Sequence, residues 1–531
     1  MKTAYTHGFV YTGRFPLRQA FIVENGCFTL VGSDTEILAQ KVDAIVDLKG
    51  KFVCAGFNDS HMHLLNLGQA LSVAPLHLHT RSLREMILCL QQTQPGRGGW
   101  ILGRGWNQDF FTDVKRMPNR WDLDKVSTDF PICAVRACGH AMVVNSKVLE
   151  LLGISGNTPQ IPGGEIVMEN GIPNGILFDN AMDLVYAAVP APSKEDLKAM
   201  LTAACGMLNS FGITSCQSDD YCVFQNVPWQ TINEAYRELE AENKLTVRVY
   251  EQANFTNLRD FSAFITAGNV TGKGTDFFKT GPLKMLGDGA LGARTAYLSE
   301  PYADAPDTRG LSVFTPEVFD EMIGYAHEQS MQVAVHCIGD ACLDLVLNSI
   351  EKALHAHPKA DHRHGIVHCQ ITRPDQLERM ARMNLHIYAQ SIFLDYDLHI
   401  VEDRVGRELA ASSYSWKTLM DKGVTVSNGS DCPVEMPNVM GGIQCAVTRC
   451  DLSGNGPYLP DEAFTVQEAL DSFTKEGAKA SFEESIKGQI DPCMLADFVI
   501  LGENPFETDP NKLKDIPILA TYLGGKPVYG A

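Results

Sequence analysis

The chain has 531 residues, of which 45% are hydrophobic and 20% charged, and its formal net charge is −20. This length exceeds one ordinary domain and suits a barrel of about 250 to 400 residues with additional modules. The negative charge, which no cluster of Lys and Arg opposes, excludes nucleic acid and anionic membrane surfaces as expected partners.

The N-terminal segment predicts neither a signal peptide nor a membrane anchor. Its first twenty residues lack a continuous apolar core, and the chain contains no apolar run long enough to span a bilayer. The 15 cysteines include no Cys-x-x-Cys pair, which favours reduced thiols over disulfides or a structural zinc site. We therefore expect a cytoplasmic protein.

Both chain ends carry short runs typical of strands separated by turns. These runs are Ala20–Val23, Cys27–Val31 and Ala44–Asp47 at the start, and Ala496–Leu501 and Ala520–Tyr522 at the end. We predict that residues 1–55 and 488–531 combine into one small β-sandwich domain.

Between the two ends, apolar runs of strand length alternate with helical patterns, which predicts an α/β fold with parallel strands and crossover helices. Eight runs can be counted, the number that closes a (β/α)8 TIM-like barrel, here over residues 56–487. They are Phe52–Asn58, Gly212–Gln217, Thr246–Gln252, Leu283–Gly287, Gln332–His336, Gly365–His368, Leu385–Gln390 and Val424–Asn428. Ala341–Ala356 and the segment from Thr315 show the apolar period of helices that pack on a sheet.

A long insertion separates the first two predicted strands. Residues 71–189 are rich in Trp, Gly and Pro and far exceed a normal connection, so we expect them to cover the active-site mouth. Trp106, His140 and Asn145 could line a substrate pocket there, although such residues in a long loop are more often packing residues.

Two histidines follow the first barrel strand, in the segment Asp59–His63. Residues two apart on a strand face the same way, so His61 and His63 can bind one cation. The same His-x-His spelling occurs at 77/79, 355/357 and 362/364. We interpret the 77/79 pair as part of a turn into a helix that Ser82 would cap. The 355/357 pair would end a helix, where the two side chains diverge. The 362/364 pair would lie in a polar loop. Of the four His-x-His pairs, only His61 and His63 lie at the end of a predicted barrel strand.

Further candidate ligands lie at the same end of other strands. His336 and His368 close the fifth and sixth strands, and Asp431 follows the eighth. Functional residues of this fold gather at the carboxyl ends of strands, so these side chains should converge. Burying so many polar groups is costly without a common partner, and a metal ion is that partner.

Lys284 lies within the apolar strand Leu283–Gly287. Burial favours a neutral amine, which can take up CO2 and become a carbamate able to bridge two cations. The alternative is an ion-paired or snorkelling lysine near the barrel wall.

The next segment, Gly287–Gly292, has the G-x-G-x-x-G spacing of dinucleotide-binding folds. The residues that follow reach Pro301 without a helical apolar stripe, so we do not expect nucleotide binding there.

These residues resemble the amidohydrolase superfamily, and more narrowly its branch of N-substituted formamide deformylase-like enzymes. The resemblance covers most of the chain. Its markers are Gly56–His63, Arg104–Asn107, Gly139–Ser146, Lys284–Gly292, His336–Asp340, Ser430–Pro433 and Leu495–Val499. Two departures, Ala55 for the usual proline and Cys493-Met494 for the usual Gly-Lys, touch no candidate ligand.

The resemblance implies a binuclear centre with six protein ligands: His61, His63, Lys284, His336, His368 and Asp431. The first two histidines would bind the more buried metal and the other two the more exposed one. Lys284, as a carbamate, would bridge both metals. Asp431 would bind metal and transfer protons.

We therefore expect hydrolysis of a non-peptide C–N bond in a small amide, formamide or cyclic amide, by attack of a metal-bridging hydroxide. Zinc suits this ligand set, as would Mn, Fe or Ni. One alternative is a mononuclear deaminase that uses His61, His63, His336 and Asp431. Another is a non-catalytic metal-binding protein on the same barrel. The sequence leaves the oligomeric state open, with a homo-oligomer as one alternative.

Overall fold

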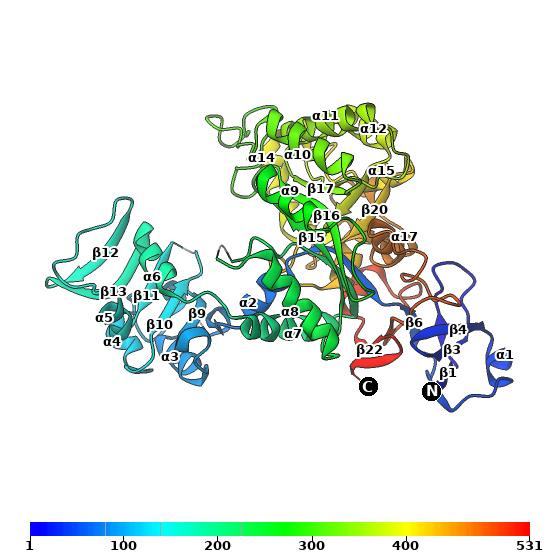
Figure 1. Cartoon of the computed structure of the whole chain (residues 1–531), viewed down its shortest axis with the longest axis horizontal. Coiled ribbons are helices and arrows are strands. Elements are labelled where there is room, and N and C mark those ends of the chain that lie inside the picture. Colours follow the sequence, from blue (N-terminus) through cyan, green and yellow to red (C-terminus); the bar gives the residue numbers. More distant parts are fainter. Residues whose placement is uncertain (80, 139, 225, 531) are drawn as a thin grey trace. The chain divides into compact units, whose positions relative to one another are not determined.

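The computed structural model describes residues 1–79, 81–138, 140–224 and 226–530. Gly139, in one of the motifs named above, lies outside them. The chain divides into two compact units (Figure 1). Unit 1 comprises Met1–Leu64, Cys205–Val223 and Tyr236–Ala531, and unit 2 comprises Leu65–Ala204 and Phe224–Ala235.

Unit 1 contains an eight-stranded sheet whose neighbours follow the order of the chain and pair in parallel. Its strands are β7 (Phe57–Met62), β14 (Ile213–Ser218), β15 (Arg248–Asn254), β16 (Phe278–Leu286), β17 (Val333–Cys337), β18 (Gly365–His368), β19 (His386–Ala389) and β20 (Thr425–Asn428). The predicted mixed α/β fold with eight parallel strands is confirmed.

The first and last strands approach each other, so the barrel is nearly closed. The Ser60 hydroxyl donates to the Asn428 carbonyl at 2.7 Å, and the Asp431 amide donates to the His61 carbonyl at 2.9 Å. Gly429 permits this approach, because a Cβ there would lie 2.6 Å from the His61 nitrogen. This contact brings Asp431 to the histidines of β7.

The predicted first strand, Phe52–Asn58, is wrong in its boundaries. It is two strands, β6 (Phe52–Ala55) and β7, with a break at Gly56. β6 pairs with β21 (Phe498–Leu501) outside the barrel. The apolar run is continuous across the break, so periodicity could not locate it. A Cβ at Gly56 would overlap the Thr214 side chain at 2.3 Å, and this close approach fixes the position of the break.

β16 begins at Phe278, five residues before the predicted start at Leu283. Gly281 and Pro282 interrupt its apolar pattern, and proline lacks the N–H that a central strand donates. The sheet accommodates the proline by a register shift between Glu251 and Ala253 on β15.

Helices between the strands lie on the outside of the barrel (Figure 1). α10 (Pro316–Glu328) and α11 (Asp340–Ala356) match the two predicted helices, and each buries the expected stripe, such as Leu343, Val346 and Ile350 on α11. The others are α9 (Leu258–Thr266), α12 (Pro374–Met383), α13 (Leu394–Asp397), α14 (Val401–Ala410), α15 (Trp416–Asp421), α16 (Val439–Thr448), α17 (Val466–Ser472) and α18 (Lys475–Ala480). α7 (Lys194–Ser210) and α8 (Trp229–Ala241) each span both units.

Strands from both chain ends form two further sheets in unit 1. One has the order β4-β3-β1-β5, and the other has the order β2-β6-β21-β22-β23. Their bounds are β1 (Lys2–Thr6), β2 (Phe9–Val10), β3 (Ala20–Glu24), β4 (Cys27–Gly32), β5 (Ala44–Asp47), β22 (Ile518–Leu523) and β23 (Lys526–Tyr529), with α1 (Asp34–Leu38) after β4. Phe21 and Phe498, from opposite ends of the sequence, pack with ring centroids 5.1 Å apart. The predicted terminal strands are present, and their assignment to a separate sandwich domain stays a prediction.

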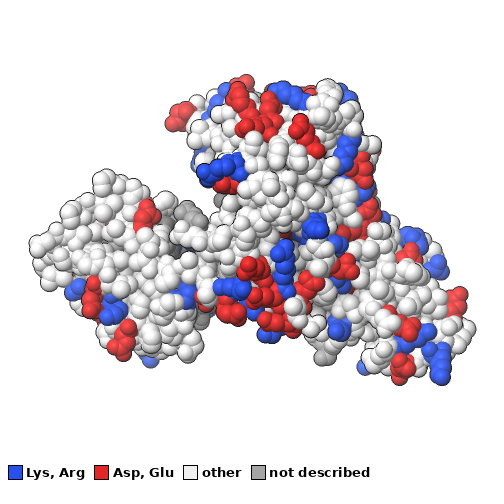
Figure 2. Space-filling model, in the orientation of Figure 1, with Lys and Arg blue, Asp and Glu red and all other residues white. Residues whose placement is uncertain are grey.

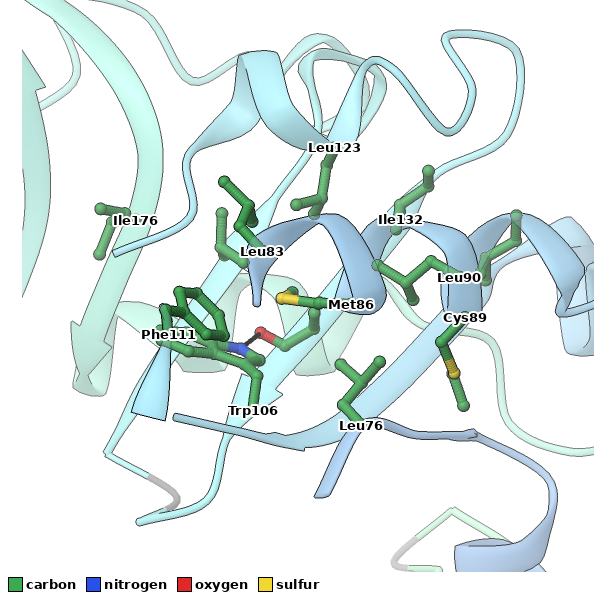
Figure 3. Packing of buried hydrophobic residues seen from close by; sticks show 14 residues of the cluster. Leu76, Leu83, Met86, Cys89, Leu90, Trp106, Phe111, Leu123, Ile132 and Ile176 are labelled. Carbon is green, nitrogen blue, oxygen red and sulfur yellow. Dashed lines mark hydrogen bonds between the residues drawn. The ribbon is translucent and has the colours of Figure 1, made fainter. Parts of the chain in front are cut away.

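Unit 2 contains a six-stranded sheet in the order β12-β13-β11-β10-β9-β8. Its strands are β8 (Ala74–Pro75), β9 (Ile101–Trp106), β10 (Ile132–Arg136), β11 (Ala141–Val144), β12 (Gly164–Glu169) and β13 (Ile172–Asp179). Its helices are α2 (Leu64–Leu71), α3 (Leu83–Gln92), α4 (Arg120–Leu123), α5 (Ser146–Leu152) and α6 (Asp183–Ala188). Figure 3 shows one of its hydrophobic clusters, in which Met86 and Leu90 of α3 pack near Leu76 and Trp106. That residues 71–189 cover the barrel mouth stays a prediction.

On the face shown in Figure 2, basic and acidic side chains are interspersed rather than gathered into one basic patch. No helix within the described residues has the length and apolar character needed to cross a membrane. The segment after Gly292 stays irregular up to α10, as its sequence predicts.

Candidate metal centre

His61, His63 and Asp431 form the most compact group of candidate ligands in unit 1. One ligand atom from each lies within 4.8 Å of the others. His61 Nε2 is 3.3 Å from Asp431 Oδ1, and His63 Nε2 is 3.0 Å from the same oxygen. The predicted convergence of these three residues, which lie up to 370 positions apart, is thus present in the structure.

His336 and His368 continue this group. The His61 and His368 ring centroids are 5.5 Å apart, and those of His368 and His336 are 4.5 Å apart. His336 Nε2 also lies 3.2 Å from the Gly289 carbonyl oxygen and 3.3 Å from Asp288 Oδ1. Four imidazoles from three strand ends therefore adjoin one another.

Lys284 lies on β16 with its side chain fully buried. Its Nζ is 3.4 Å from Asp219 Oδ2, a long separation for an ion pair. Asn254 Nδ2 donates to the same carboxylate oxygen at 3.0 Å. Asp219 follows β14, so it lies at the same end of the barrel as the candidate ligands.

The Nδ1 atoms of three histidines contact fixed acceptors. His61 Nδ1 lies 2.8 Å from Gln252 Oε1, and His368 Nδ1 lies 2.8 Å from Gln390 Oε1. His63 Nδ1 lies 3.2 Å from the Asp219 carbonyl oxygen. With Nδ1 engaged in this way, Nε2 of each ring is the nitrogen left for a metal ion.

The electrostatics of the group depend on burial and on Asp431. Burial lowers the pKa of His61 to about 4. Burial also acts to lower the pKa of His63, but the hydrogen bond and charge of Asp431 outweigh it and raise that pKa to about 9. Burial acts to raise the pKa of Asp431, but the neighbouring imidazoles of His61 and His63 outweigh it and hold that pKa well below its usual range. Asp431 is therefore a carboxylate.

Two candidate ligands have left-handed backbone conformations, which are uncommon outside glycine. The φ angles are 72° at His368 and 58° at Asp431. The Trp416 indole nitrogen donates to the His368 carbonyl at 3.1 Å, and the Asp431 amide is held by His61 as described above. Such conformations concentrate at functional sites, where the surrounding structure maintains them.

The chemistry of this donor set fits a divalent cation. Imidazole nitrogens and a carboxylate are the ligands that zinc and related metals prefer. In the structure, Asp431 contacts His61 and His63, and Lys284 pairs with Asp219. The residues present therefore suit the metal that the resemblance implies, and Asp288 adds a second carboxylate beside His336.

The three predicted pocket residues of the insertion have contacts within unit 2. Trp106 is fully buried in the cluster of Figure 3, and its indole nitrogen donates to the Ala134 carbonyl at 2.9 Å. Asn145 is buried and caps α5. His140 is exposed, with Nδ1 2.9 Å from Asp179 Oδ1. Their role in substrate binding stays a prediction.

The other His-x-His pairs have the structural positions that their context indicates. His77 lies in a short helix before α3, whose N-cap is Ser82, and His355 lies in the last turn of α11. His364 lies in the loop before β18 but is buried, with Nε2 2.9 Å from His327 Nδ1. Within the described part of unit 1, no ring contact or ion pair joins the 355/357 or 362/364 pair to a candidate ligand.

The sequence analysis missed Asp219, Gln252 and Gln390. Gln252 and Gln390 are the last residues of two predicted strands, so the rule that selected His336 and His368 could have selected them. Asp and Gln residues occur in many buried hydrogen-bond networks, so their presence at a strand end does not by itself indicate a metal site.

Comparison with known proteins identifies the family to which the chain is related. Residues 44–529 match the model of the amidohydrolase family. The chain is 35% identical over 542 aligned positions to YtcJ of Bacillus subtilis (strain 168), a protein designated as an amidohydrolase, covering 100% of this chain and 99% of YtcJ. It is 25% identical to the N-substituted formamide deformylase of Arthrobacter pascens, covering 96% and 94% of the two chains.

The fold also matches a solved structure. A metal-dependent hydrolase of Pyrococcus furiosus, described as uncharacterized, superposes with a TM-score of 0.79 at 28% identity, covering 96% of this chain and 100% of that one.

Proposed function

The chain belongs to the amidohydrolase family and is a metal-dependent hydrolase, and we propose that it cleaves a non-peptide C–N bond in a small amide, formamide or cyclic amide. The observation that carries the proposal is the meeting of His61, His63 and Asp431 at the closed edge of the barrel, with His368 and His336 beside them. The similarity to a formamide deformylase supports this class of bond.

We propose that the centre holds two divalent cations, most simply zinc. His61 and His63 would bind one cation, and His336 and His368 would bind the other. Lys284, as a carbamate, would bind both cations. The cations would supply a water of lowered pKa and polarise the substrate carbonyl.

Asp431 is the residue we propose for proton transfer. Its carboxylate is ionised and lies at the junction of β20 and β7, within hydrogen-bonding distance of two ligand imidazoles. It would accept a proton from the attacking water and return it to the leaving nitrogen. The backbone at Asp431 is fixed by the His61 carbonyl, so the carboxylate is held in place before substrate arrives.

One observation favours a second candidate, a mononuclear deaminase-type centre. His61, His63 and Asp431 are more compact than the rest of the group, and His336 completes the set that such a centre needs. In that case Lys284 would be a bystander paired with Asp219. The number of metal ions per chain separates the two candidates.

The test combines elemental analysis of the purified protein with a screen of N-formyl amines, N-acyl amines and cyclic amides. We expect two divalent ions per chain, and release of an amine that stops on removal of metal and returns on its restoration. Asp431→Asn should keep the fold and lower kcat by at least about 100-fold. Full turnover by a metal-loaded Asp431→Asn variant would contradict the role of Asp431, and a metal-loaded wild type inactive across the panel would contradict the hydrolase proposal.

A further inference from the structure

Two buried glutamines contact two of the proposed ligands in the same way. Gln252 on β15 reaches His61, and Gln390, directly after β19, reaches His368, each through Oε1 at 2.8 Å from the imidazole Nδ1. Neither glutamine side chain is exposed to solvent. The two contacts lie on different strands, so the arrangement occurs twice independently.

The orientation of each amide group is fixed by a backbone carbonyl. Gln252 Nε2 donates to the Ser60 carbonyl at 3.3 Å, and Gln390 Nε2 donates to the Tyr388 carbonyl at 3.0 Å. A carbonyl can only accept, so the NH2 group of each amide must face it and Oε1 must face the histidine. The amide oxygen can also only accept, and therefore Nδ1 of His61 and of His368 must carry the hydrogen. In a neutral imidazole, Nε2 then has the free lone pair.

We infer that Gln252 and Gln390 are positioning residues that set the tautomer and the ring direction of His61 and His368, so that Nε2 of each is presented to a cation. This inference rests on the proposed metal centre. An amide is neutral, so it orients the imidazole without adding a negative charge. A carboxylate in its place would raise the basicity of the ligand and strengthen metal binding.

The chain offers a matched control. Gln217 on β14 is equally buried, and its Nε2 donates to the Gly477 carbonyl at 3.0 Å. No hydrogen bond within the described residues joins Gln217 to a histidine. Gln217→Leu therefore reproduces the loss of a buried glutamine in a barrel strand without removing a hydrogen bond to a histidine.

The experiment measures zinc partitioning between the holoprotein and a chelating dye. We expect Gln252→Leu and Gln390→Leu to weaken zinc binding by about 10- to 100-fold. Gln217→Leu should bind zinc as tightly as the wild type. Circular dichroism and thermal unfolding would check that each variant is folded.

The outcomes separate this inference from the proposed function. Wild-type zinc affinity in both Leu variants, or equal weakening in Gln217→Leu, would overturn the inference and leave the metal centre standing. The finding that the wild-type protein binds no divalent ion would overturn the proposed function itself.

Discussion

At the scale of single residues, Lys284 is the side chain that would distinguish the proposed binuclear centre from a mononuclear one. A carbamate on its Nζ would offer two oxygens, whereas an ammonium paired with Asp219 offers none. We predict that Lys284→Ala loses one metal ion per chain and lowers kcat/KM by more than about 100-fold. Added short carboxylic acids should restore part of the metal content and part of kcat/KM, because they can occupy the space that the lysine side chain leaves.

The control for this prediction is Lys279→Ala. Lys279 lies on the same strand and pairs with Glu483 at 2.7 Å, away from the histidines. Unchanged metal content and rate in Lys284→Ala would exclude the bridging role and favour the mononuclear candidate.

His386 gives the barrel a defined response to acid. Burial, with smaller contributions from Lys479 and Arg363, lowers its pKa from 6.5 to about 3. The folded state therefore binds no proton at His386 in a pH range where the unfolded state does. The contribution of neutral His386 to the free energy of unfolding is fully present above about pH 6.5. This contribution is lost as the pH falls from there towards about 3.

We predict that the wild type loses about 1.4 kcal/mol more stability than His386→Gln between pH 7.5 and pH 5.5. Urea unfolding of both proteins at the two pH values measures this difference. An equal loss in the variant would show that His386 does not contribute to the acid response.

At the scale of elements, α5 depends on Asn145. The Asn145 Oδ1 accepts from the Val148 and Ile132 amides at 3.2 and 3.1 Å. Its Nδ2 donates to the Ser127 and Phe130 carbonyls at 2.8 and 2.9 Å. The side chain thus joins the cap of α5, the start of strand β10 and the loop that precedes β10.

We predict that Asn145→Ala destabilises the protein by about 2 to 4 kcal/mol, because it removes a cap and leaves buried backbone groups unpaired. Asn257→Ala, which removes the exposed cap of α9, should cost about 1 kcal/mol. Thermal unfolding measures both. A raised KM with unchanged stability in Asn145→Ala would instead support the predicted role in substrate binding.

At the scale of the whole molecule, a buried ion pair joins the barrel to the C-terminal strands within unit 1. Arg248 on β15 donates to both carboxylate oxygens of Asp497, at 2.6 and 3.0 Å, and both side chains are buried. The Gly524 amide, between β22 and β23, donates to the same carboxylate at 2.7 Å. The pair therefore couples two sheets that are far apart in sequence.

We predict that Asp497→Ala destabilises the protein by about 3 to 5 kcal/mol, because it leaves a buried guanidinium uncompensated. Arg259→Ala, which removes an exposed pair with Asp260, should leave the stability nearly unchanged. Equal unfolding midpoints for these two variants in denaturant would contradict a structural role for the buried pair.

The sequence by itself determined the eight parallel strands and identified most residues of the candidate metal centre. Most of the barrel strands include apolar runs, because they are buried on both faces, so their approximate positions are readable from the sequence. In this fold, polar residues at the carboxyl ends of such strands lie on one side of the ring, which is why His61, His336 and Asp431 could be assigned together.

The tertiary structure alone decided which side chains meet. The break at Gly56 depends on the approach of Thr214, and Asp219 and Gln390 matter only through the residues they contact. Trp106 has the sequence context of a pocket residue, but packing places its ring in a hydrophobic cluster. A local pattern reports the environment along one segment, whereas these features depend on distances between segments that only folding sets.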